Sequence, residues 1–96
     1  MNCCHKFFGT LGSKLKADII HELKDKELSV TELANILQEE RSKVSHALLI
    51  LKTCSFVIPK KEGRKQIYSI NKETILPLLH LAETHIKKYC KRCITR

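Results

Sequence analysis

The sequence lacks any apolar run that approaches the ~18 residues of a membrane-spanning helix, and its N-terminus lacks the apolar segment of a secretory signal peptide. We therefore expect a soluble, cytoplasmic protein. It has no Ser/His/Asp combination typical of nucleophilic catalysis and no glycine-rich phosphate-binding loop, so nothing supports an enzyme. Internal repeats, low-complexity segments and linkers are also absent, which predicts one domain over residues 1–96.

Positive charge is in excess. The chain has 18 lysines and arginines against 10 acidic residues, for a formal net charge of +8 and a pI of about 9.4. This balance favours polyanionic partners, either nucleic acid or an anionic membrane surface, and charge alone does not choose between them. Because a chain of this length buries only about 60–65% of its unfolded surface, a partner subunit or a metal ion would add useful stability.

Residues 41–53 form the stretch around which the chain is organised. Apolar residues recur there at the spacing of one helical face: Val44, Ala47, Leu48 and Leu51. The opposite side, at the helix start, carries short hydrogen-bonding and cationic side chains: Ser42, Lys43, Ser45 and His46. Such a face suits the major groove of DNA, although on this stretch alone an ordinary solvated face is the alternative interpretation.

The segment just before this helix contains a strong helix-start signal. Ser29 and Glu32 have the spacing of a capping box, and Leu28 and Leu33 occupy the two positions of a hydrophobic staple. We therefore predict a helix over residues 30–37. Only four residues then precede the helix at 41–53 if Arg41 is counted with the turn, and this arrangement predicts a helix-turn-helix.

After residue 53 the pattern changes from helix to strand. Residues 56–58 are a short apolar run, residues 60–65 form a polar tip with a glycine at its turn, and residues 66–70 alternate as a strand. This predicts a β-hairpin. Its cations, which could lie along a phosphate backbone, are Lys60, Lys61, Arg64 and Lys65.

Further helices are predicted at both ends of the chain. One covers residues 1–11 and stops at Gly12 through a left-handed C-cap, and Ser13 then caps a second helix over residues 14–25. The last helix runs from residue 75 to about residue 93, with Thr74 rather than Asn71 as its N-cap.

The last helix has a long apolar stripe that one small domain cannot cover, made of Ile75, Leu78, Leu79, Ala82, Ile86 and Tyr89. We expect a second copy of the chain to cover it, so that the N- and C-terminal helices form a homodimer interface.

The chain resembles the ArsR family of small dimeric transcriptional repressors. The resemblance rests on L-S-V-T-E-L-A at 28–34, K-V-S-H-A-L-L-I-L at 43–51 and K-E-G-R-K-Q-I-Y at 61–68. It implies a mainly α winged helix-turn-helix with five helices and a small β-hairpin, which binds duplex DNA as a homodimer. On this interpretation the DNA-binding residues are Arg41, Ser42, Lys43, Ser45, His46, Lys60, Lys61, Arg64 and Lys65.

Several positions depart from the family pattern. Gln38 stands where the family usually has a turn glycine, and Leu49 stands where it often has a basic residue. Residues 28–31 lack the cysteine pair of members that sense soft metals. The pair His80 and Glu83 lacks the upstream D-x-H of zinc-responsive members. The inducer is therefore unknown.

The five cysteines predict free thiols or metal ligands rather than disulfides, because the count is odd and the compartment is reducing. Cys90 and Cys93 form a C-x-x-C, while Cys3 and Cys4 lie at the other end of the chain. The family resemblance implies that the terminal helices pack together. These thiols, with His85 or His5, would then bind one structural Zn²⁺ per subunit. The alternative is that the thiols are unrelated, and Cys54 is expected in the core.

Two other functional classes compete with DNA binding. A thiol-disulfide oxidoreductase using Cys90 and Cys93 is disfavoured, because a redox C-x-x-C normally lies at a helix N-terminus. A winged-helix interaction module that binds no DNA is disfavoured by the basic helix and hairpin. Salt-dependent retention on duplex DNA separates these classes.

Overall fold

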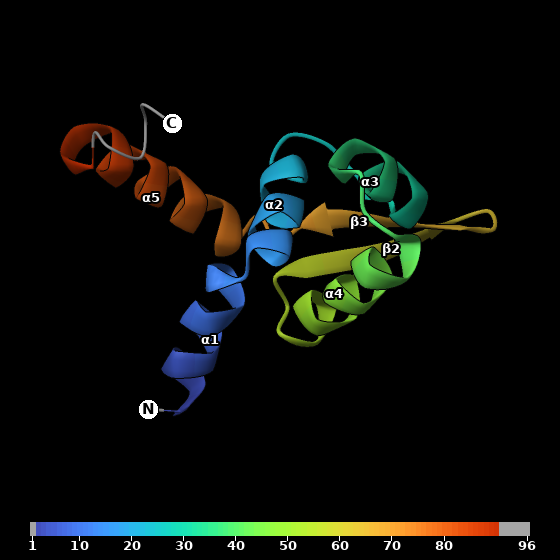
Figure 1. The fold of residues 1–96 in the computed structure, drawn as a ribbon, viewed down its shortest axis with the longest axis horizontal. Helices are drawn as coiled ribbons and strands as arrows, with labels where there is room; N and C mark the ends of the chain where they lie inside the picture. The colour runs from blue at the N-terminus through green and yellow to red at the C-terminus, as the bar shows by residue number, and fades with distance from the viewer. Residues whose placement is uncertain (1, 91–96) are drawn as a thin grey trace.

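A computed structural model of the chain describes the backbone of residues 2–90 and the side chains of residues 5–90. Within this range the chain forms five helices and one three-stranded antiparallel sheet (Figure 1). The elements, in chain order, are α1 (Asn2–Gly12), α2 (Lys14–Glu22), β1 (Leu28–Ser29), α3 (Val30–Leu37), α4 (Arg41–Thr53), β2 (Val57–Glu62), β3 (Lys65–Ile70) and α5 (Ile75–Tyr89).

Helices α3 and α4 have the bounds predicted from the sequence. The capping box is present: the Glu32 backbone N–H donates to Ser29 Oγ at 3.2 Å, and the Ser29 backbone N–H donates to Glu32 Oε1 at 2.9 Å. These bonds satisfy two backbone donors at the start of α3. The four predicted core residues of α4 are all buried, and the helix-turn-helix is therefore confirmed.

The turn between α3 and α4 is left-handed at Gln38, with φ 54° and ψ 48°. The Glu39 backbone N–H donates to the Ala34 carbonyl oxygen at 3.0 Å, which is the long hydrogen bond of a Schellman C-cap. A side chain in this conformation crowds the backbone, and glycine usually takes this position. Gln38 is therefore a point of local backbone strain.

Replacing Gln38 with glycine is expected to stabilise the protein by about 0.5–1 kcal/mol. Relief of the left-handed strain, about 1–2 kcal/mol, is partly offset by the larger entropy that glycine loses on folding. Urea denaturation measures the difference. Glu39→Gly is the control, because Glu39 has no positive φ and the same substitution there should lower stability. A destabilised Gln38→Gly protein would contradict this account of the turn.

The hairpin is longer and its turn tighter than the sequence suggested. Strand β2 reaches Glu62 and β3 starts at Lys65, so that only Gly63 and Arg64 lie outside the ladder. Gly63 has φ 63°, a value that glycine adopts without steric cost. The sequence analysis missed β1, which pairs through Leu28 with Tyr68 and through Ser29 with Ile67.

Three details of the outer helices differ from prediction. Helix α2 ends at Glu22 rather than near residue 25, because the chain turns back at the buried Leu23 to start β1. Gly12 is the last residue of α1 and has no positive φ. Helix α5 ends at Tyr89 within the described residues. Thr74 precedes it as predicted, but the side chain of Asn71 accepts the free backbone hydrogen bonds, from Glu73 at 3.0 Å and Thr74 at 3.3 Å.

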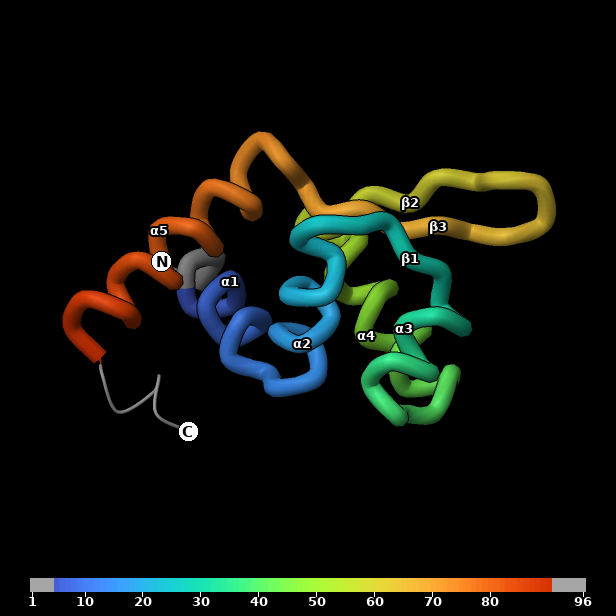
Figure 2. The backbone as a smooth tube through the Cα atoms, turned by 90° about the horizontal axis from the view of Figure 1, so that it is seen from above, coloured from blue at the N-terminus to red at the C-terminus, as the bar shows by residue number. Residues whose placement is uncertain are grey.

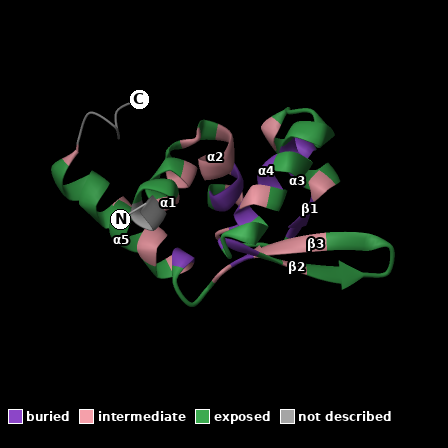
Figure 3. Cartoon of the chain, turned by 90° about the horizontal axis from the view of Figure 1, so that it is seen from below, coloured by how far each residue is buried: buried purple, intermediate pink, exposed green. Residues whose placement is uncertain are grey.

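The buried side chains gather between α2, α3, α4 and the base of the sheet (Figure 3). The largest of them include Phe56, Ile19, Ile20, Leu33 and Leu48. The hairpin projects from one end of this body, and α1 and α5 extend from the other (Figures 1 and 2). None of the helices within residues 2–90 is long and apolar enough to cross a membrane.

Candidate nucleic-acid interface

The exposed face of α4 carries every residue that the sequence analysis assigned to base contact. Ser42, Lys43, Ser45 and His46 are exposed, and the buried side of the helix holds them against the core. Lys43 Nζ lies 4.0 Å from Glu39 Oε1, one turn earlier. Because both partners are largely exposed, the pairing is weak and leaves Lys43 able to contact DNA.

A groove of about 330 Å³ separates the start of α4 from α2. It is lined by Ser13, Leu15, Lys16, Ser42, Lys43, His46 and Ala47. The sequence analysis treated α2 as a packing helix only, and therefore missed Ser13 and Lys16. Their proximity to α4 comes from the packing of α2 against it, which no local pattern encodes. The groove adds another cation beside the predicted base-reading residues.

The hairpin cations are all exposed. Lys60 Nζ lies 3.7 Å from Glu62 Oε2, while Lys61, Arg64 and Lys65 form no ion pair with any described residue. Lys60 and Lys61 belong to β2 and Lys65 to β3. The structure thus places these charges on an ordered ladder rather than on the broad loop expected from the sequence.

A second hollow, of about 250 Å³, joins the hairpin to the helix-turn-helix. Its lining residues are Ser29, Val30, Thr31, Arg41, Arg64, Lys65 and Gln66. Arg41 at the start of α4 thereby lies beside the two cations of the hairpin. The candidate DNA-binding residues of two separate sequence segments consequently form one continuous basic surface.

Leu49 lies on the same exposed face of α4, with 56% of its surface accessible. It follows Ser42 by two helical turns, on the side opposite the core. The Thr53 hydroxyl, one turn later, donates to the Leu49 carbonyl oxygen at 2.8 Å. The second half of this face is therefore less polar than the first, and base contacts should concentrate near the helix start.

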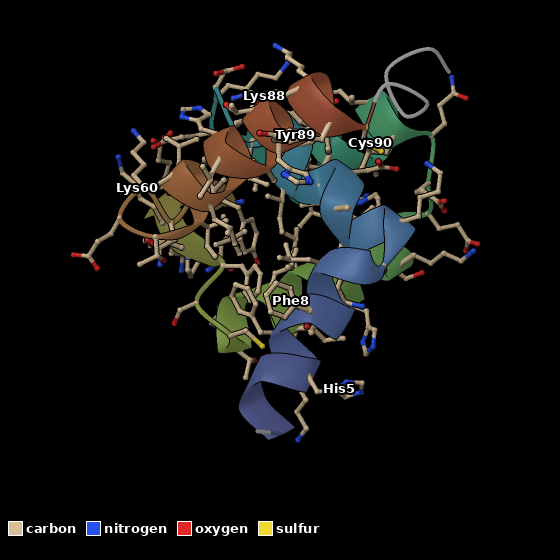
Figure 4. The ribbon with its side chains drawn as sticks, turned by 90° about the vertical axis from the view of Figure 1, so that its left-hand side faces the viewer. His5, Phe8, Lys60, Lys88, Tyr89 and Cys90 are labelled. Carbon is tan, nitrogen blue, oxygen red and sulfur yellow. The ribbon has the colours of Figure 1, made fainter. Side chains whose placement is uncertain are left out.

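The apolar side chains of α1 and α5 are unusually accessible. Phe8, Leu81 and Tyr89 are 63%, 69% and 68% exposed, respectively. Figure 4 shows Phe8 on α1 and Tyr89 on α5, both on the end of the molecule remote from the hairpin. This is the surface that the sequence analysis assigned to dimer formation.

Helix α5 is attached to the body through Glu83. Lys24 Nζ donates to Glu83 Oε2 at 2.6 Å, and His21 Nδ1 lies 4.0 Å from the same oxygen. The hydrogen bond from Lys24 lowers the pKa of the Glu83 carboxyl and raises the pKa of Lys24. Both shifts favour the charged pair, which fixes the direction in which α5 leaves the body.

Most of the predicted metal ligands cannot be placed. The side chains of Cys3 and Cys4 and the whole of Cys93 lie outside the described residues. His85 stacks near Tyr89, with ring centroids 5.1 Å apart, and Cys90 follows the end of α5. His5 and Cys90 lie at opposite sides of the molecule (Figure 4). Among side chains 5–90, no three candidate ligands cluster. Cys54, predicted to be core, is exposed.

Comparison with known proteins gives a consistent family. The family model for bacterial regulatory proteins of the arsR family matches residues 13–58, from the N-cap of α2 into β2. The transcriptional regulator NmtR of Mycobacterium tuberculosis is 34% identical over 67 residues, which are 70% of this chain but only 56% of NmtR. A homolog of the cadmium resistance regulatory protein CadC from Staphylococcus aureus is 31% identical over 81 residues, 83% of this chain and 67% of the relative.

Solved structures agree over nearly the whole fold. Rv0081 of M. tuberculosis superposes with a TM-score of 0.87 at 26% identity, covering 97% of this chain and 94% of that one. The domain Mb0332 of Mycobacterium bovis, described as a homodimeric winged helix-turn-helix DNA-binding domain, has a TM-score of 0.81 at 23% identity. That match covers 88% of this chain and 78% of the domain. The fold is therefore a winged helix-turn-helix, in which β2 and β3 form the wing.

Proposed function

The chain belongs to the arsR family of bacterial regulatory proteins, and from this premise we propose that it is a sequence-specific DNA-binding transcriptional regulator. It acts in the cytoplasm as a homodimer, and as a repressor if it follows the family resemblance. Two α4 helices enter successive major grooves, about 34 Å apart, and the wings lie on the phosphate backbone.

One observation carries this proposal: the basic surface is continuous. Arg41 lines a hollow with the wing residues Arg64 and Lys65, while Lys43 and His46 line a groove with α2. A purely solvated helix face would not require cations from three other parts of the fold to surround it. This geometry suits a duplex, which presents base edges between two rows of phosphates.

Homodimer formation is proposed on separate grounds. Leu81 and Tyr89 on α5 and Phe8 on α1 leave an exposed apolar surface that water solvates poorly. A second copy of the chain would bury it by two-fold symmetry. The M. bovis domain of similar fold, described as homodimeric, supports this assembly.

Neutralising the wing is expected to weaken binding to all DNA sequences alike. For Arg64→Gln combined with Lys65→Gln, the slope of log affinity against log salt should fall by about two, close to one per lost phosphate contact. Fluorescence anisotropy across a salt series measures it. The control is Lys26→Gln, an exposed lysine that lines neither the groove nor the wing hollow. Altered sequence preference at an unchanged slope would contradict the wing assignment.

We also propose that Cys90 and Cys93, with Cys3 or Cys4, bind one Zn²⁺ per chain, and that His85 or His5 fills a vacant position. Cysteine thiolates and imidazoles are the ligands of structural zinc sites. Since α1 and α5 diverge within one chain (Figure 1), the two groups of ligands would come from different subunits of the dimer. The name of the S. aureus relative, which refers to cadmium resistance, is compatible with a soft-metal site.

Elemental analysis of anaerobically purified protein is expected to find about one zinc per chain, and a chelator is expected to lower the melting temperature. The variant Cys90→Ser with Cys93→Ser should lose both properties. Cys54→Ser, which removes an exposed thiol outside the proposed site, should keep them. If the double variant keeps its metal and its stability, these thiols are not ligands.

Two other functions are disfavoured. Cys90 lies at the C-terminal end of α5, where the helix dipole does not lower a thiol pKa, so thiol-redox catalysis lacks its usual support. An interaction module that binds no DNA would not need the basic surface. Salt-dependent retention on duplex DNA tests the proposal directly, and the absence of any retention at low salt would refute it.

A further inference from the structure

Three cations from separate elements surround the hollow between the wing and the helix-turn-helix. Arg41 begins α4, Arg64 lies in the hairpin turn, and Lys65 begins β3. The remaining wall consists of Ser29, Val30, Thr31 and Gln66, which add hydroxyl and amide groups. No carboxylate lines this hollow. Its cations are therefore held together by the fold without a counter-charge at the same place.

The ion pairs of the described residues strengthen this point. Lys43 pairs with Glu39 and Lys60 pairs with Glu62, whereas Arg41, Arg64 and Lys65 form no ion pair with any residue in the described range. The nearby carboxylate of Glu32 accepts the Ser29 backbone N–H at 2.9 Å, and its pKa is lowered chiefly by that bond, with a smaller contribution from Lys65. Glu32 is thus engaged in the capping box rather than in the hollow.

We propose that this hollow binds one phosphodiester group of the DNA backbone, as a site that joins the wing to the recognition helix. This inference rests on the proposed function and specifies which groups hold the duplex. Guanidinium groups bind phosphate oxygens through paired N–H donors, so Arg41 and Arg64 supply the main contacts. Lys65 adds a point charge. A volume of about 250 Å³ far exceeds the ~30 Å³ share of one water, which leaves room for the phosphate.

The site assigns a different role to Arg41 than to its neighbours on α4. Phosphate contacts fix the register of a protein on the duplex, and base contacts give sequence preference. Arg41 belongs to the first group, and base reading is left to Ser42, Lys43, Ser45 and His46. A phosphate bound between α4 and the wing would also set the depth at which α4 enters the groove.

The test uses the full chain and a duplex selected from a random pool for binding to it. Each phosphate of this duplex is replaced in turn by a neutral methylphosphonate. One position in each half-site should lower wild-type affinity by about tenfold or more, the scale of a charged hydrogen bond. The variant Arg41→Gln with Arg64→Gln should bind less tightly and should be insensitive to methylphosphonate at that position. Lys61→Gln, a wing cation outside the hollow, should remain sensitive.

Each outcome is informative. If wild-type protein binds no duplex, the proposed function and this inference both fail. If it binds but the double variant remains as sensitive as wild type at every position, the phosphate site is overturned while DNA binding stands. Tight binding of inorganic phosphate at sub-millimolar concentration, with NMR shift changes at Arg41 and Arg64, would assign the hollow to a free anion and would also overturn it.

Discussion

Replacing Leu81 with aspartate is expected to convert the protein to a monomer and to lower its affinity for a two-half-site duplex by at least about 100-fold. Leu81 is the most exposed large apolar side chain among the described residues, at 69%. A carboxylate in the dimer interface would have to lose its hydration without a partner. A monomer also loses the effective concentration that links two half-sites, which is typically a factor of 10²–10⁴.

Sedimentation equilibrium and DNA titration measure the two effects on the same samples. Ile36→Asp is the matched control, because Ile36 is 45% exposed on α3, away from α1 and α5, and should leave the dimer intact. Circular dichroism checks that both variants are folded. A Leu81→Asp protein that remains a dimer would show that α5 does not form the interface.

The second large effect concerns the start of α4. The variant Ser45→Ala with His46→Ala is expected to lose about 100-fold in affinity for its selected duplex, since each base contact contributes about 1–3 kcal/mol of discrimination. Affinity for unrelated duplexes should change little, because the backbone contacts remain. Both residues are exposed, so stability should stay within about 0.5 kcal/mol of wild type.

Competition between selected and random duplexes measures this loss of discrimination. Asn35→Ala, an exposed polar residue on α3, is the control and should keep the wild-type preference. If the double variant discriminates as well as wild type, the base-reading role belongs to other residues on the basic surface.

The helix-turn-helix was predictable because its signals are local. Ser29 and Glu32 are three residues apart and specify the start of α3 through their own side chains. The period of Val44, Ala47, Leu48 and Leu51 specifies which side of α4 is buried. Where a pattern of neighbouring residues determines the structure, prediction and structure agree to the residue.

Features that depend on distant residues were missed or misjudged. Strand β1 has only two residues, too short for any alternation, and exists because Leu28 and Ser29 pair with Tyr68 and Ile67. The caps of α5 depend on Asn71, whose side-chain NH₂ also donates to the Ser55 carbonyl oxygen at 2.9 Å. This tertiary bond orients the Asn71 oxygen toward the helix start, and the sequence contains no sign of it.

The candidate site shows the same division. Residues of the α4 face and the wing were found by type and spacing, and the structure leaves all of them accessible. The sequence did not reveal that Arg41 shares a hollow with Arg64, or that Lys16 borders the face of α4. These neighbours come from packing between elements, which has no sequence period.

The central claim is that two copies of this chain read DNA through paired α4 helices, and the sequences that the protein selects from a random duplex pool test it most directly. The selected duplexes should contain an inverted repeat whose half-site centres lie about 10–11 base pairs apart, one helical turn, and should bind two chains each. Single, unpaired motifs, or a pool that remains random after repeated selection, would contradict it.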